Sequence, residues 1–167
     1  AKNEEEAKKL LAVTAPVKNL SEYIDKFDLT LKLMQDYESL RRIAYELVGD
    51  NAAENVTYFE VRFSPILHQQ KGMSLVQIVD AVLEGLRAGE RDFKIKTGVI
   101  ICGIRSIPPE TSLQLAELAV RYKNRGVVAF DLAGREFNYP AKDHAEAFYI
   151  IRKNCVNCTA HAGEAYG

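Results

Sequence analysis

The feature that most constrains the fold is a repeat in which a strand-like segment is followed by an amphipathic helix. We expect strands at 56–62, 97–104, 127–132 and 157–161, and the later starts are about 30 residues apart, the length of one βα step. Successive βα steps imply a parallel sheet with right-handed crossovers. The chain is therefore predicted to be α/β. A doubly wound sheet and part of a (β/α)8 barrel both fit this pattern.

Local signals mark the ends of the helices. Ser74 and Gln77 stand where a capping box would begin the helix after the first strand, and Asp143 with Glu146 is placed to cap the last one. Asn55 is a natural stop for the helix before the first strand. Apolar residues at three- and four-residue spacing predict the buried faces: Leu40, Ile43, Ala44, Leu47 and Val48; Leu75, Ile78, Val79, Val82, Leu83 and Leu86; Leu115, Leu118, Ala119 and Tyr122.

Charge and cysteine content narrow the class of protein. The 22 lysines and arginines balance 23 acidic residues, giving a net charge of −1, so we expect neither nucleic acid nor an anionic membrane as a partner. No apolar stretch approaches the roughly 20 residues that span a bilayer, and the acidic N-terminus does not resemble a signal peptide. Three cysteines are poor material for a disulfide framework. We therefore expect a soluble cytoplasmic protein.

The carboxyl ends of the predicted strands are where functional groups gather in either architecture. His161 ends the last predicted strand, which we expect to be buried, and could offer a ring nitrogen to a metal. Glu164, one short turn further, could donate or accept a proton. The alternative is a core histidine and a solvated loop acid. Gly134 could bring a bare backbone N–H to a ligand, or could simply serve a tight turn.

Taken together, four segments resemble the adenosine deaminase family, in its bacterial form, within the metal-dependent amidohydrolase superfamily. They are Phe59–Pro65, Asp131–Gly134, Pro140–His144 and His161–Ala165. Their order and spacing match across nearly the whole chain. The combination of His-Ala-Gly-Glu with Asp-Leu-Ala-Gly one βα unit earlier is specific, although either motif alone would be weak.

The resemblance implies a (β/α)8 barrel with one Zn²⁺ and hydrolysis of adenosine or deoxyadenosine to inosine products and ammonia. It implies that His161 is a metal ligand and that Glu164 protonates N1 of the purine as zinc-bound hydroxide attacks C6. Gly134 matches the glycine whose N–H meets N3 of the base. An apolar helix would cover the substrate, although its spacing also fits ordinary helix packing: Leu20, Tyr23, Ile24 and Phe27.

The chain departs from the family pattern in its metal ligands. Its histidines are His68, His144 and His161, so the His-x-His pair of the family's first strand is missing, as are the later histidine and paired aspartates. We therefore expect an internal fragment: one partial-barrel domain over 1–167, with lid and packing helices in 1–55 and about four βα units in 56–167. Its partner would be the remainder of the same barrel, and the isolated chain would be inactive.

Two alternative functions remain open. One is a sister deaminase acting on adenine or another 6-aminopurine nucleoside, and the other is a non-catalytic half-barrel serving as an interaction or structural piece. Arg135 stands where the family usually has an acidic or amide residue. Cys155 and Cys158 are expected to be structural. His68 is expected in a loop, His144 at the surface or as a cap, and Arg62 in a buried position that needs a carboxylate partner.

Overall fold

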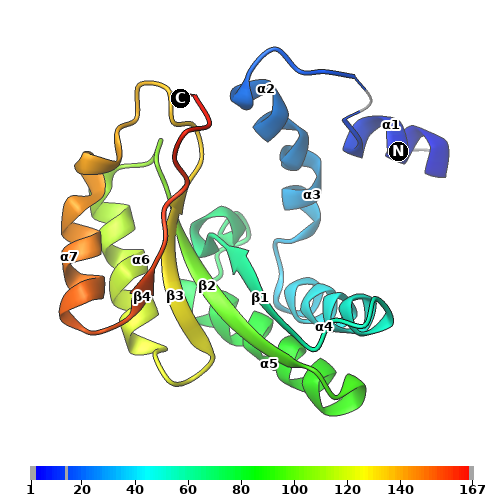
Figure 1. Cartoon of the computed structure of the whole chain (residues 1–167). Coiled ribbons are helices and arrows are strands. Elements are labelled where there is room, and N and C mark those ends of the chain that lie inside the picture. The colour runs from blue at the N-terminus through cyan, green and yellow to red at the C-terminus, as the bar shows by residue number, and fades with distance from the viewer. Residues whose placement is uncertain (1–2, 14, 166–167) are drawn as a thin grey trace.

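The computed structural model describes residues 3–13 and 15–165. Four strands alternate with helices after a helical N-terminal segment (Figure 1). In chain order the elements are α1 (Glu4–Leu11), α2 (Leu20–Ile24), η1 (Asp25–Phe27), α3 (Asp28–Leu33), α4 (Tyr37–Ala53), β1 (Tyr58–Phe63), η2 (Pro65–His68), α5 (Leu75–Phe93), β2 (Lys96–Ile104), α6 (Pro109–Arg121), β3 (Val127–Ala133), η3 (Ala141–His144), α7 (Ala145–Lys153) and β4 (Asn157–Cys158).

The sheet is parallel and its strands lie in sequence order, β1-β2-β3-β4. Each connection therefore moves one strand in the same direction, and right-handed crossovers place all the connecting helices on one face. Figure 1 shows α6 and α7 together on one side of β3 and β4. The expected order of four parallel βα units is confirmed, and the single helical face favours a partial barrel over a doubly wound sheet.

The side chains of the sheet separate into two faces accordingly. In β1 the half-buried Phe59, Val61 and Phe63 pack against the core, while the residues between them are exposed. The core lies between the helices and the sheet, where fully buried side chains such as Ile101 and Phe130 meet the helices. The opposite face of the sheet carries the polar side chains of the candidate site.

Helix α4, which precedes the sheet, packs against α5 with very close backbone approach. A Cβ at Gly85 would collide with the carbonyl oxygen of Arg41, and a Cβ at Gly89 would lie 2.5 Å from the Cβ of Val48. The two helices can pack this closely only because α5 has no side chain at these positions. Side chains of α4 and α5 belong to the same core cluster as those of β2, and the inward side chains of β1 pack against that cluster.

The N-terminal helices are attached differently. Among the described residues of α2, η1 and α3 none is buried. The segment joins the sheet region at Gln35, which is 2% exposed. The Gln35 amide nitrogen donates to the carbonyls of Leu31 and Leu67, at 2.8 and 2.9 Å, and its oxygen accepts from the N–H of Gln70 at 3.0 Å. Figure 1 shows α2 at the end of the molecule where the described chain ends after β4.

Several local predictions can be compared with the structure. The capping box of Ser74 and Gln77 is confirmed. The cap by Asp143 and Glu146 is wrong, because η3 runs through residue 144 and α7 begins at Ala145 without a side-chain cap. The last strand is shorter and more exposed than expected: β4 has two exposed residues, because it lies at the sheet edge and pairs on one side only. Its ladder continues as the His161 N–H donates to the Leu132 carbonyl.

No helix in the described part of the chain is long and apolar enough to cross a membrane.

Candidate active site

The carboxylate of Asp131 is the centre of a polar cluster on the open face of the sheet. Its side chain is completely buried, and it is approached by a side chain of β1 and by side chains of the segment that follows β4. Oδ1 accepts a hydrogen bond from Thr159 Oγ1 at 2.8 Å. Oδ2 lies 3.0 Å from Nδ1 of His161 and 3.4 Å from Nε of Arg62. A buried carboxylate is stable only with such partners, so the cluster fixes the side chains of β1 and the segment after β4 relative to β3.

This geometry fixes the ring of His161. Nδ1 lies within hydrogen-bonding distance of the Asp131 carboxylate, which can only accept, so Nδ1 carries a proton; in the neutral form of the ring Nε2 is then the nitrogen with a free lone pair. Metal-binding histidines in proteins are oriented in the same way by a carboxylate behind the ring. Within residues 3–13 and 15–165 no group of three or more histidine, cysteine or acidic side chains could hold a metal ion. The residues therefore fit one ligand position of a zinc site and not a complete site.

Arg62 was correctly expected to pair with a carboxylate but is not buried. Its side chain is 44% exposed, because β1 is an edge strand and its outer face is open.

His144, which was expected at the surface or as a cap, is buried instead. It is 2% exposed, and its Nε2 lies 3.2 Å from the Arg105 carbonyl oxygen. His68 lies in η2, also 2% exposed, with Nδ1 2.8 Å from the Met34 carbonyl. Both histidines therefore contact the backbone of other segments rather than solvent.

Cys102 of β2 also contacts the cluster, a residue that sequence analysis did not single out. Its sulfur lies 3.7 Å from Oδ2 of Asp131. Burial, assisted by the charge of Asp131, raises the pKa of this thiol to about 12. The thiol therefore remains protonated at neutral pH and is neither a nucleophile nor a ready metal ligand. Cys155 and Cys158 are exposed free thiols; Cys155 lies in the turn between α7 and β4, and Cys158 is the second residue of β4.

The loop that carries Glu164 is held by the side chain of Glu136. Oε1 of Glu136 accepts the N–H of Gly163 at 3.1 Å, and Oε2 accepts those of Glu164 and Ala165 at 2.9 and 2.8 Å. Gly163 has a φ of +81°, a conformation that glycine adopts without strain. Glu136 was not predicted, because an isolated acid after a strand gives no pattern that sequence analysis could detect.

Glu164 borders two hollows at the carboxyl ends of the strands. One, of about 390 Å³, is lined by Glu164 together with the Asp131 cluster and Ile100. The other, of about 420 Å³, lies between this loop and α2 and includes Leu20 and Arg135. Nη2 of Arg135 lies 2.8 Å from Oδ1 of Asp25, which links the loop after β3 to η1 through an exposed ion pair.

The other predicted site residues are placed as follows. Gly134 follows β3 with a φ of +98°, so a glycine suits the turn there whether or not it binds a ligand. In the predicted apolar helix, Leu20 and Ile24 are half-buried while Tyr23 and Phe27 are 43% and 48% exposed. The rings of Tyr23 and Phe27 contact each other edge to face, with centroids 5.5 Å apart. This stripe is therefore not part of the core.

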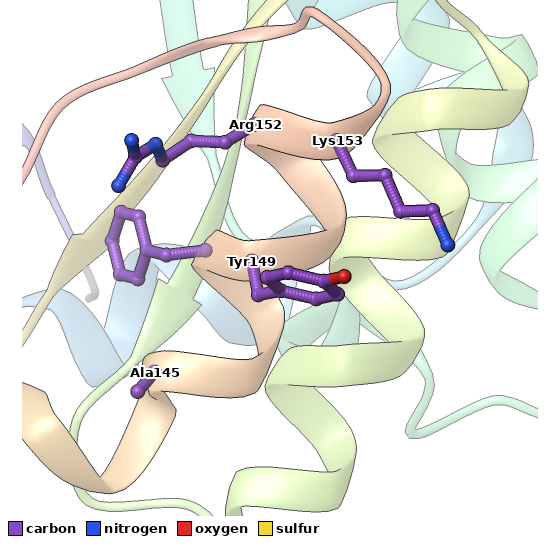
Figure 2. Close-up of a pocket in the computed structure, with 5 residues that line it drawn as sticks. Ala145, Tyr149, Arg152 and Lys153 are labelled. Carbon is purple, nitrogen blue, oxygen red and sulfur yellow. The ribbon is translucent and has the colours of Figure 1, made fainter.

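A further hollow of about 640 Å³ lies on α7, as Figure 2 shows. It is lined by Ala145, Phe148, Tyr149, Arg152 and Lys153. Tyr149 is 62% exposed, and the Lys153 ammonium lies 6.0 Å from the centre of its ring. None of the predicted site residues lines this surface, and it contains no carboxylate or histidine. We therefore place the site at the carboxyl ends of the strands.

Comparison with known proteins shows which family the chain is similar to. A family model described as adenosine deaminase matches residues 1–167. An adenosine deaminase of Mycobacterium ulcerans is 44% identical over 154 residues, covering 89% of this chain and 42% of the relative.

Solved structures show the same arrangement of elements. The Arabidopsis protein ADAL, complexed with IMP, superposes with a TM-score of 0.81 at 31% identity, covering 89% of this chain and 46% of that one. An amidohydrolase from Burkholderia ambifaria with bound Zn gives a TM-score of 0.84 at 26% identity, covering 96% and 44%. The chain thus spans less than half the length of these relatives, and its four βα units are part of a (β/α)8 barrel.

Proposed function

The chain belongs to the adenosine deaminase family, and on that premise we propose that the complete protein hydrolyses adenosine and deoxyadenosine to inosine products and ammonia. The observation that carries the proposal is the convergence of two groups on one hollow. An oriented histidine, His161 backed by Asp131, and an acid, Glu164, line the same space at the carboxyl ends of the strands. This pairing suits a reaction that needs both a metal-assisted nucleophile and a proton donor.

We propose that His161 supplies one zinc ligand through Nε2 and that segments outside this chain supply the others. The proposal is supported by the Asp131 contact to Nδ1, which leaves Nε2 for the metal, and by the zinc in the Burkholderia amidohydrolase. A bound Zn²⁺ lowers the pKa of water and so supplies a nucleophile near neutral pH. Asp131, for its part, keeps the imidazole in the tautomer that a metal requires.

Glu164 is proposed as the general acid that delivers a proton to N1 of the purine. Protonation of N1 removes the aromatic penalty to attack at C6, so the acid must stand beside the ring as attack occurs. The N–H of Gly134 would meet N3, because no side chain at that position keeps the purine edge at a distance. The exposed stripe of α2 and η1, made of Leu20, Tyr23, Ile24 and Phe27, would cover the bound nucleoside. Leu20, which shares a hollow with Glu164, supports this role.

A 6-aminopurine nucleotide is the second candidate substrate. The Arabidopsis protein was solved with IMP, and here two cationic residues, Lys18 and Arg135, line the hollow beside Glu164. Rates on adenosine, adenine and AMP, measured side by side with the complete protein, separate the candidates. Faster turnover of AMP would replace the nucleoside by the nucleotide. No turnover of any of the three would favour the non-catalytic half-barrel.

The reaction mechanism is tested by substituting Glu164 with glutamine. Glutamine keeps the shape but cannot deliver a proton, so Glu164→Gln should lower kcat by about 10²–10⁴ while zinc content stays normal. His161→Ala should instead lose zinc and activity together. The fall in adenosine absorbance and a metal analysis measure the two effects, with the exposed Glu146→Gln as a control. If Glu164→Gln retains near-full activity, Glu164 is only a loop acid and the mechanism is wrong.

We propose, finally, that residues 1–167 form a single partial-barrel domain that the remainder of the same protein completes. The proposal is supported by the coverage of less than half of each relative described above. It is also supported by the two edge strands, β1 and β4, which pair on one side only. A closed barrel pairs both edges and so removes them.

A further inference from the structure

The loop that contains His161 and Glu164 is held through backbone hydrogen bonds by two buried side chains of opposite charge. Glu136 is 11% exposed and Arg105 is 3% exposed, and Nη2 of Arg105 lies 3.8 Å from Oε1 of Glu136. Both lie just beyond strand ends, Arg105 directly after β2 and Glu136 shortly after β3. Neither lines the hollow that contains the Asp131 cluster, so neither is placed to touch the reacting part of a substrate in that hollow.

The two side chains hold different points of the loop. Nη2 of Arg105 donates to the carbonyl oxygen of His161 at 2.6 Å, and Nη1 donates to the Tyr139 carbonyl at 2.9 Å. Glu136 accepts the three consecutive N–H groups of Gly163, Glu164 and Ala165. The backbone on both sides of the bend at Gly163 is therefore fixed to the same ion pair.

This arrangement determines where the carboxyl group of Glu164 can lie. Hydrogen bonds to ionised groups are stronger than neutral ones, and the Glu136 carboxylate accepts three of them within one turn of chain. With the N–H of Glu164 bonded, its Cα is held in place and only the side-chain torsions remain to be set. A proton donor displaced by about 1 Å can lose about 10² in rate, so the precision of this anchoring matters to the proposed chemistry.

We propose that Glu136, supported by Arg105, is the positioning residue that sets the general acid Glu164 against the purine. The inference rests on the proposed function. A positioning role differs from a purely structural role, because a residue that only stabilises the loop would have no selective effect on the chemical step. The positioning role predicts a loss in kcat with KM unchanged, as expected for an interaction that matters only in the transition state.

The test compares variants of the complete protein, with adenosine as substrate. Glu136→Gln keeps the volume but removes the charge and one acceptor oxygen, so kcat should fall by about 10–100-fold, the range for groups behind a reacting residue, with KM and zinc content unchanged. Glu136→Asp restores the charge and both oxygens on a shorter arm and should recover part of the loss. Glu146→Gln, an exposed acid on α7, is the matched control and should behave as wild type.

The outcomes separate this inference from the proposed function. A Glu136→Gln protein with wild-type kcat beside an inactive Glu164→Gln protein would overturn the positioning role and leave the mechanism intact. Full activity in both variants would overturn the mechanism itself. If Glu136→Gln loses zinc or folded protein in proportion to its activity, the residue is a structural staple and the inference is wrong. If Glu136→Gln does not fold, the kcat and KM of Glu136→Asp decide by the same criterion.

Discussion

Replacing Asp131 by asparagine should disturb both the stability of the sheet face and the metal. Asparagine keeps the volume and can still accept from Thr159 through Oδ1, a bond of 2.8 Å. Its amide nitrogen then occupies the place of Oδ2, where His161 Nδ1 lies 3.0 Å and Arg62 Nε 3.4 Å away. The His161 and Arg62 N–H donors then face the amide nitrogen, which is itself a donor, and no acceptor is left between them. The side chain at position 131 is fully buried, so water cannot reach the amide nitrogen itself.

The magnitude follows from the bonds that are lost. A hydrogen bond to a charged group stabilises by about 1.5–3 kcal/mol, and an unsatisfied buried donor costs about 1–3 kcal/mol. Because Arg62 is 44% exposed, solvent replaces most of its contribution. The expected loss is about 3 kcal/mol in the free energy of unfolding. The amide would also favour the His161 tautomer with the proton on Nε2, so zinc affinity should fall about 10–100-fold.

Urea unfolding and competition with a zinc chelator, both on the complete protein, measure the two effects. Asp143→Asn is the matched control, since this aspartate is exposed on η3. The reasoning is refuted if Asp131→Asn unfolds within about 0.5 kcal/mol of wild type, the scatter of surface substitutions, and binds zinc with unchanged affinity.

Two further predictions concern pH and helix packing. Burial lowers the pKa of His68 in the folded state, an effect larger than that of its hydrogen bond to the Met34 carbonyl. The neutral ring is therefore favoured on folding. This contribution to stability is complete above the unfolded pKa of about 6.5 and is lost as pH falls through the lower folded value. His68→Asn, which keeps an N–H donor, should flatten the decline in urea midpoint between about pH 7.5 and pH 5.5, and an equally steep decline would contradict it. Gly85→Ala places a Cβ against the Arg41 carbonyl and should cost about 1–3 kcal/mol, whereas Gly49→Ala, whose Cβ meets only a movable phenyl ring, should be near neutral in the same unfolding assay.

The order and direction of the strands could be predicted because apolar runs and helical stripes depend on local sequence. The shortening of β4 could not, because it depends on which strands lie beside it. His144 shows the same limit. Its burial comes from the loop after β2, whose Arg105 carbonyl lies 3.2 Å from Nε2, and no local pattern encodes that contact.

The candidate site was predictable where its residues form a motif. His161, Glu164 and Gly134 could be named from short segments, and a carboxylate partner for Arg62 was predicted from its expected burial at a strand end, although the side chain is in fact 44% exposed. The identity of that carboxylate, Asp131, required the register of β1, β2 and β3. Glu136 could not be found at all, since its bonds run to residues 27 to 29 positions later.

The attachment at Gln35 has a consequence for how α2 and η1 would act. This buried side chain joins the N-terminal helices to the sheet region, so in the proposed covering role the exposed stripe of Tyr23 and Phe27 would be a tethered ligand for the opening above the strands. Its encounter with that opening is intramolecular and depends on effective concentration more than on affinity. A weak contact is then sufficient to bias the equilibrium. The exposed ion pair of Arg135 and Asp25 is such a contact, and rising salt concentration should shift the helix outward by screening it.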